Sequence, residues 1–297
     1  MSGIELALAA CREGIVGSFP THNARSPGEL AEWLERLRVA AVDAQGAFGP
    51  YAPNLVVHRG NKRLDADMEA LLRDPPPFVV TSVGPPGQVI GALHDAGVGV
   101  LADVASLRHA ERAVSAGADG LVLLCGGAGG NTGWANPFAF IRAVRERFEG
   151  IIAVAGGIAA GSTLLAAQVA GADLCHVGTL FVASQESMAD PEYKRALVAA
   201  SLDDVVVSST VTGLPVNVLR DWMATQTDAK EASTPSGGLL ERMLDNLDRG
   251  GVASWSSGHA VASVTEVLTV AQIVAKLDAE YGDAVQGMRK YVSQGSE

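Results

Sequence analysis

The sequence has only three cysteines, Cys11, Cys125 and Cys175, which are far apart and show no CxxC or Cys/His spacing. An odd and scattered set of this kind does not build a disulfide framework. No two histidines or carboxylates show the i, i+4 spacing of metal ligands on a credible helix face. We therefore expect reduced, buried cysteines and no bound metal.

Basic clusters and long apolar runs are also missing. The formal net charge is -11, which disfavours binding to nucleic acid and to anionic lipid surfaces. No apolar run reaches the roughly 18 residues of a membrane span. The first residues contain Glu5 and no basic start, unlike a signal peptide. We expect a cytoplasmic protein that has neither nucleic acid nor membrane as a partner.

Aromatic residues make up only 5% of the chain, whereas 48% of residues are hydrophobic and 34 are glycine. Such a composition favours a buried, Val-rich parallel sheet covered by helices with small side chains. A repeated pattern supports this interpretation: amphipathic segments end at Gly14, Gly97, Gly117 and Gly171, and an apolar run follows each. Glycine is favoured at a left-handed helix end, so each unit is predicted to pass from helix to strand.

Seven predicted strands follow one another along the chain, most of them separated by a helix: 15–18, 54–58, 78–83, 98–103, 120–125, 151–155 and 174–177. An alternating series of this length favours a (β/α)₈ TIM-type barrel, which commonly takes about 250 residues. One strand is then missing, and we expect it to precede residue 5. We expect the barrel to span residues 1–184. Residues 185–297 break the pattern and are predicted to form a C-terminal helical cap or extension, with a final helix near Val264–Leu277.

Paired glycines follow the last two predicted strands. Gly156 and Gly157 come after the strand 151–155, and Gly178-Thr179 comes after the strand 174–177. Loops at these two strand ends are the usual phosphate cradle of the barrel, because bare backbone N–H groups can approach phosphate oxygens there. Tight turns would also explain either pair alone, but the two together predict phosphate binding.

The loop 126–133, Gly-Gly-Ala-Gly-Gly-Asn-Thr-Gly, has five glycines in eight residues. The next helix begins only near Asn136, so this is not the strand–turn–helix unit of a dinucleotide-binding fold. We interpret it as a loop pressed close to a flat ligand at the barrel mouth, with a flexible connector as the alternative.

These motifs, with Asn136-Pro-Phe-Ala-Phe140, Ala155-Gly-Gly-Ile158 and Gly178-Thr-Leu-Phe181, resemble the nitronate monooxygenase family. The similarity runs from Ser2 to about Trp222 and extends to 256–259. It implies an FMN over the barrel mouth. The residues that the resemblance assigns to the FMN phosphate are Gly156, Gly157, Gly178 and Thr179, with Ala155 as a further cofactor-binding residue. Those that it assigns to the ring and ribityl chain are Asn54, Ser82 and Gly130.

The sequence departs from the family pattern at several positions. The family's first strand would lie upstream of Ser2. Asn131 stands where the family usually has its catalytic histidine, and an amide cannot accept a proton near pH 7. Asp103 stands where some members have a lysine near the flavin, and His259 stands where a glutamine is common. His176 is either a group at the mouth or a core histidine bonded to backbone.

The resemblance implies an FMN-dependent oxidoreductase that oxidises alkyl nitronates with molecular oxygen, with Asn131 orienting the substrate. Two alternatives stay open within the fold: an FMN-dependent reductase or dehydrogenase acting on a quinone, a steroid fragment or an acyl thioester with a nicotinamide donor, and a flavin-binding protein without turnover. A cofactor-free phosphosugar aldolase or isomerase would use the same cradle, but no lysine falls at a predicted strand end. Homo-oligomerisation is compatible with the sequence.

Overall fold

The structure, a computed structural model, describes residues 1–227 and 254–294. In chain order the elements of the first half are α1 (Ile4–Arg12), β1 (Gly17–Pro20), η1 (Thr21–Asn23), α2 (Pro27–Asp43), β2 (Tyr51–Val56), α3 (Leu64–Arg73), β3 (Phe78–Ser82), α4 (Gly87–Asp95), β4 (Gly99–Val104), α5 (Leu107–Ser115) and β5 (Gly120–Leu124). The second half contains β6 (Gly130–Asn131), α6 (Pro137–Arg145), β7 (Ile151–Ala155), α7 (Gly161–Ala170), β8 (Leu174–His176), α8 (Thr179–Val182), α9 (Pro191–Ala199), η2 (Leu202–Asp204), β9 (Val205–Ser208), β10 (Val216–Leu219), α10 (Arg220–Thr227), η4 (His259–Ser263) and α12 (Val270–Gln294).

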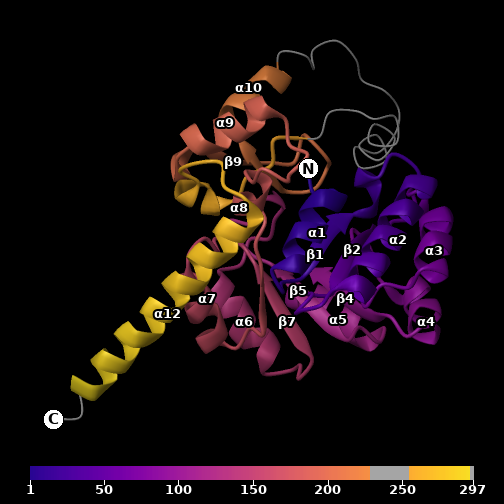
Figure 1. The fold of residues 1–297 in the computed structure, drawn as a ribbon, viewed down its shortest axis with the longest axis horizontal. Helices are drawn as coiled ribbons and strands as arrows, with labels where there is room; N and C mark the ends of the chain where they lie inside the picture. Colours follow the sequence, from indigo (N-terminus) through magenta and orange to yellow (C-terminus); the bar gives the residue numbers. More distant parts are fainter. Residues whose placement is uncertain (228–253, 295–297) are drawn as a thin grey trace.

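Seven parallel strands form one curled sheet in the order β1-β2-β3-β4-β5-β7-β8, with helices outside it (Figure 1). Each of the seven predicted strands is present, shifted by no more than a few residues. The four predicted helix-end glycines all have positive φ, from 76° at Gly14 to 112° at Gly171, a conformation that side chains disfavour. The barrel-type fold predicted from the repeated helix–glycine–strand pattern is therefore confirmed.

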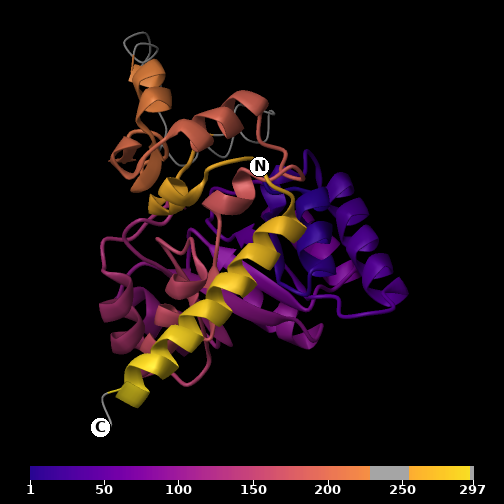
Figure 2. The ribbon, with the colours of Figure 1, turned by 60° about the vertical axis from the view of Figure 1, so that its left-hand side comes forward.

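The sheet is open between β1 and β8, which have no neighbour on their outer edges in the described part of the chain. The C-terminal helix α12 lies beside this opening and packs against α7, and Leu6 and Ala10 of α1 join Val270 of α12 in one apolar cluster (Figure 2). Close packing fixes this arrangement: a Cβ on Gly161 of α7 would lie 1.9 Å from the Tyr281 nitrogen. The helix thus occupies the layer outside the opening.

The last helix differs from its predicted bounds, because it begins at Val270 rather than near Val264 and runs to Gln294. Thr269 and Gln272 form reciprocal side-chain to backbone hydrogen bonds of 3.2 and 2.9 Å, and the Glu186 carboxylate accepts from the Val270 N–H at 3.1 Å. These bonds satisfy N–H groups of the first turn, so they set the start of the helix at Val270.

The C-terminal extension contains strands as well as the predicted helices. β9 and β10 pair with each other and with β6 in an antiparallel sheet of three strands, where Asn131 faces Val216 and Gly130 faces Asn217. Because β6 belongs to the glycine-rich loop after β5, this small sheet ties the extension to the barrel mouth.

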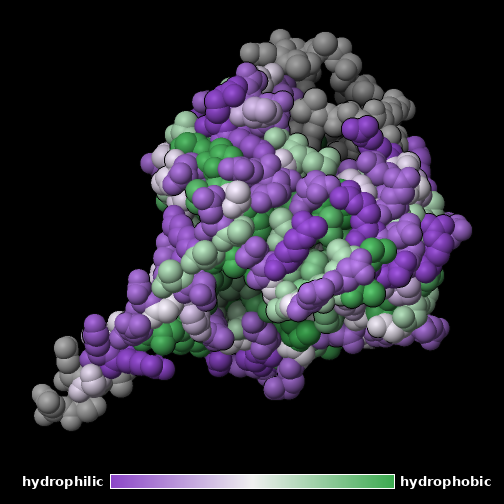
Figure 3. All heavy atoms as spheres, viewed as in Figure 1, coloured by the Kyte–Doolittle hydropathy of each residue, from purple (hydrophilic) through white to green (hydrophobic). Residues whose placement is uncertain are grey.

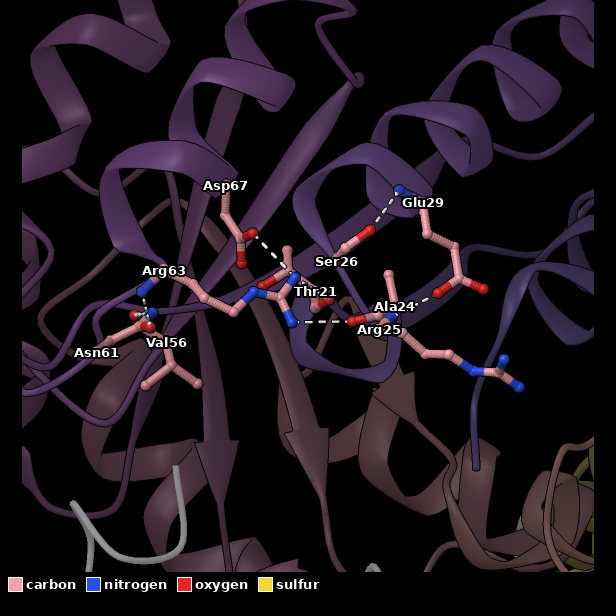
Figure 4. Close-up of polar contacts among 9 residues, drawn as sticks. All are labelled: Thr21, Ala24, Arg25, Ser26, Glu29, Val56, Asn61, Arg63 and Asp67. Carbon is pink, nitrogen blue, oxygen red and sulfur yellow. Dashed lines mark hydrogen bonds and ion pairs between the residues drawn. The ribbon is translucent and has the colours of Figure 1, made fainter. Parts of the chain in front are cut away.

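Arg63 holds two loops together at the carboxyl ends of β1 and β2 (Figure 4). Its guanidinium donates to the carbonyl oxygens of Ala24 at 2.9 Å and Thr21 at 3.4 Å, and it pairs with the buried Asp67 at 3.0 Å. Asn61 donates to the Val56 carbonyl at 2.7 Å in the same loop. This network fixes the loops beside the mouth.

Candidate functional site

The inner face of the sheet carries an apolar layer below its carboxyl ends. Alternate residues point inward, and the buried inner cluster is Ala52, Val80, Leu101, Val122, Ala128, Ala153 and Ala155. A cavity of about 520 Å³ is lined by members of this layer and reaches through the opening between β1 and β8 to α12. Figure 3 shows hydrophobic residues gathered around a recess beside this helix. The interior can therefore accommodate an apolar group below the mouth.

Polar side chains form the next inward layer on β2, β3 and β4. Asn54, Ser82 and Asp103 each lie two residues beyond a member of the apolar layer, so they share its inward direction. The Ser82 hydroxyl donates to Asn54 Oδ1 at 2.6 Å, and Asn54 Nδ2 lies 3.4 Å from Asp103 Oδ2. The structure thus joins the two predicted flavin contacts, Asn54 and Ser82, in one chain with Asp103.

The backbone just beyond this layer is strained. Val83 has a φ of 60°, a left-handed conformation that is an outlier for a β-branched residue. The Ser82 carbonyl accepts from the Val57 N–H at 2.9 Å, and Gln88 donates to the Val57 carbonyl at 2.6 Å. Strain of this kind persists only where surrounding bonds hold it. The position of Ser82 is thereby fixed from both sides.

Two ionisable side chains lie on the inner face of the seven strands, Asp103 on β4 and His176 on β8. Burial raises the pKa of the Asp103 carboxyl to about 7, partly offset by the Asn54 hydrogen bond. Although His176 is exposed toward the cavity that it lines, the protein around it lowers the pKa of its ring. Asp103, with a pKa near neutrality, can exchange protons in the pH range of most enzymes.

Bare backbone lines the carboxyl ends of β7 and β8. A Cβ on Gly157 or on Gly178 would meet no atom within 4 Å, whereas one on Gly156 would lie 3.0 Å from the Gly126 carbonyl oxygen. Gly156 and Gly157 both have positive φ, 129° and 72°. Gly157 and Gly178 thus leave an open space beside two neighbouring strand ends, as a phosphate cradle requires. Gly156 instead allows close packing on the glycine-rich loop.

Thr179 and the glycine-rich loop are contacted by residues 257–259. The Gly258 N–H donates to Thr179 Oγ1 at 3.0 Å, and the His259 N–H donates to the Gly127 carbonyl at 2.9 Å. Added Cβ atoms on Gly127 and Gly129 would meet His259 Nδ1 and the Gly258 nitrogen, both at 2.7 Å. The sequence predicts that this loop lies close to a flat ligand. At Gly127 and Gly129, however, the neighbour is another part of the chain, residues 258–259.

Gly130 and Asn131 lie in β6, where they pair with β10. Gly130 has a φ of 68°, and Asn131 is half-buried. Asn217 of β10 is buried and donates to the Ala128 carbonyl at 2.7 Å and to Thr132 Oγ1 at 3.1 Å. The position of Asn131 therefore depends on the extension.

Sequence reasoning missed two residues of this region. No local sequence pattern points to Asn217, because its hydrogen-bond partners, Thr132 and Ala128, are 85 and 89 positions away in the chain. Asp103 was noted only as a departure from a pattern, although an acidic residue at the end of an apolar strand could have been recognised as an inward-facing group. In residues 1–227 and 254–294, no group of three metal-ligating side chains occurs and no helix is long and apolar enough to cross a membrane.

Comparison with known proteins gives one family match: the model of nitronate monooxygenase matches residues 35–280. The chain is 27% identical over 246 residues to a nitronate monooxygenase of Paraburkholderia phytofirmans, covering 77% of this chain and 67% of that protein. It is 31% identical over 164 residues to a Rhodococcus jostii protein named (3aS,4S,5R,7aS)-5-hydroxy-7a-methyl-1-oxo-octahydro-1H-indene-4-carboxyl-CoA dehydrogenase, covering 54% of this chain and 46% of that one. The chain thus spans only about half to two thirds of these relatives.

Among solved structures, FabK from Thermotoga maritima superposes with a TM-score of 0.83 at 29% identity, covering 98% of this chain and 92% of that chain. Nitroalkane oxidase from Streptomyces ansochromogenes superposes with a TM-score of 0.79 at 23% identity, covering 96% and 94%, which is a likeness of fold alone.

Proposed function

The chain belongs to the nitronate monooxygenase family and is an oxidoreductase, and we propose that it binds FMN and oxidises alkyl nitronates with molecular oxygen. The observation that carries the proposal is the open backbone at Gly157 and Gly178, on neighbouring strand ends where this barrel type binds phosphate. A single terminal phosphate fits such a cradle, and the described chain has no Rossmann-type strand–glycine–helix unit for an adenosine half.

We assign the FMN phosphate to the two loops that contain Ala155, Gly156, Gly157, Gly178 and Thr179. Gly157 and Gly178 leave the space, and Thr179, the residue after Gly178, has its side-chain oxygen held by the Gly258 N–H. Asn54, Ser82 and Gly130 are assigned to the ring and ribityl chain. When bound, FMN supplies the electron-transfer chemistry toward oxygen.

Asn131 is assigned to the substrate. Its amide can donate hydrogen bonds to the nitro oxygens of a nitronate, which arrives already deprotonated and so needs no base from this residue. The small sheet formed with β10 holds the backbone of Asn131 in place.

The proposal is tested by adding an alkyl nitronate, such as ethyl nitronate, to purified protein saturated with FMN. We expect bleaching of the flavin absorbance under anaerobic conditions and oxygen consumption in air. Replacing Asn131 with Ala should raise KM for the nitronate about tenfold, the cost of one lost hydrogen bond to a charged group, without changing flavin content. Flavin that stays oxidised with every nitronate tried would contradict the proposal.

A second candidate is an FMN-dependent reductase or dehydrogenase acting on an acyl thioester, a steroid fragment or a quinone. The apolar cavity of about 520 Å³ below the mouth favours it, as do the named CoA ester substrate of the Rhodococcus relative and the FabK structure. This candidate would be selected if NADH or NADPH bleaches the flavin absorbance, one of these acceptors reoxidises the flavin, and nitronates do not bleach it.

A further inference from the structure

The polar layer on β2, β3 and β4 has a fixed direction of hydrogen bonding. Because Ser82 donates to Asn54 Oδ1 at 2.6 Å, the Asn54 amide must turn its Nδ2 toward Asp103. Asp103 lies between two neighbouring strands: the strand register places Ser82 of β3 on one side of it and Val122 of β5 on the other. The carboxyl group is thus oriented by a donor and held in the middle of the sheet.

In residues 1–227 and 254–294, no ion pair involves Asp103, and its side chain is half-buried. On the inner faces of the seven described strands the one other titratable group is His176, three strands away on β8. A carboxylate without a countercharge in an enclosed site gains by taking up a proton.

We propose that Asp103 is the general base that removes a carbon-bound proton from a neutral carbon acid, such as a nitroalkane, at the barrel mouth. The C–H bond breaks, the proton passes to a carboxylate oxygen of Asp103, and the electron pair spreads over the nitro group to give the nitronate. The proton then leaves Asp103 for solvent. Asn54 is a positioning residue.

This inference rests on the proposed function, and it supplies the basic group that Asn131 cannot provide. An amide at position 131 can orient the nitro oxygens but cannot accept the proton. The base is thus supplied by a strand end rather than by the loop after β5. With Asp103 in this role, the chain can act on neutral substrates as well as on nitronates.

The first experiment compares neutral nitroethane with ethyl nitronate on FMN-saturated wild type, Asp103→Asn and His176→Gln. The asparagine keeps the shape of the side chain but not its basicity. We expect Asp103→Asn to lower the ratio of neutral to nitronate turnover by about 10²–10⁴-fold, the usual contribution of a general base. His176→Gln should keep the wild-type ratio. Wild-type turnover of nitroethane should rise with pH through a midpoint that Asp103→Asn abolishes.

A second experiment does not depend on flavin oxidation. Exchange of the nitroethane α-protons for deuterium in D₂O, followed by ¹H NMR, reports proton abstraction directly, and ¹³C NMR of carboxyl-labelled aspartates reports the titration of Asp103. We expect exchange in wild type, its loss in Asp103→Asn, and one aspartate signal titrating near neutral pH that this variant lacks.

The outcomes separate the two proposals. Absence of nitronate oxidation with exchange retained would count against the proposed function and support Asp103 as the base. Unchanged exchange in Asp103→Asn, loss of exchange in His176→Gln instead, or no exchange in wild type would overturn the role of Asp103.

Discussion

The two sides of the barrel mouth are built from different chemical groups. On the side of β2, β3 and β4 the inward groups are side chains, Asn54, Ser82 and Asp103, linked by hydrogen bonds. On the side of β7 and β8 the open positions are Gly157 and Gly178, where bare backbone faces free space. Backbone N–H groups keep their charge distribution at every pH, whereas a carboxyl group does not. One side is therefore suited to holding a phosphate and the other to moving a proton.

The largest expected effect comes from filling the backbone side. Gly178→Leu places a side chain in the open space without backbone strain, because Gly178 does not have positive φ. It should lower flavin occupancy at least tenfold, about 1.4 kcal/mol of binding free energy or more. Absorbance of the purified protein measures this. Gly91→Leu, at an equally open position in α4, is the matched control and should keep its flavin. Full occupancy in Gly178→Leu would make that glycine a turn residue only.

On the side of β2, β3 and β4, Asp103 should make the free energy of unfolding depend on pH. The folded pKa of Asp103, about 7, is above the unfolded value of about 3.9, so the folded state binds this proton more tightly. Protonation of Asp103 therefore stabilises the folded state. This contribution to the free energy of unfolding is fully present below about pH 4 and is lost as pH rises to about 7, by up to about 1.4 kcal/mol per pH unit. Urea unfolding between pH 5 and 8 should show this loss in wild type relative to Asp103→Asn. Parallel curves for the two proteins would mean that Asp103 is charged throughout.

A smaller effect on stability is expected at Asn217, through which β10 of the extension binds the glycine-rich loop. Asn217→Asp replaces two donated hydrogen bonds by a carboxylate facing the Ala128 carbonyl. The free energy of unfolding should fall by about 1–3 kcal/mol, the cost of a buried unsatisfied group. Asn23→Asp removes a single donated bond at a half-buried position and should cost less. Equal effects of the two changes would show that the small sheet does not depend on Asn217.

The smallest effect tests the strain beside Ser82. Val83→Gly removes a β-branched side chain from a positive φ, which costs about 1–3 kcal/mol, and adds entropy of about 0.4–1 kcal/mol to the unfolded chain. The net change should be a slight stabilisation in urea unfolding. Val207→Gly, at a mostly exposed strand position without positive φ, should destabilise. A clear destabilisation by Val83→Gly would mean that the valine contributes packing that outweighs its strain.

The two sides also differ in how far the sequence predicts them. The strands and the paired glycines carry local signals, since a glycine at each helix end and an apolar run after it are both readable within ten residues. The three-stranded sheet carries none, because β6 has two residues and pairs with β10 at a separation of 85 positions or more. The start of α12 was missed because apolar residues at 264 and 267–268 extend the helical pattern beyond the capping pair Thr269 and Gln272. The alignment of Asn54, Ser82 and Asp103 follows from strand register, which the sequence of each strand alone does not determine.

The most direct test of the central claim, that bare backbone after β7 and β8 holds a single terminal phosphate of FMN, is the identity of the bound cofactor. Protein purified with its natural cofactor, or reconstituted with an equimolar mixture of FMN and FAD, is heat-denatured and the released flavin is separated by chromatography. The account predicts FMN at a stoichiometry approaching one per chain in wild type and its loss in Gly178→Leu. Release of FAD, or a protein that takes up neither flavin, would contradict it.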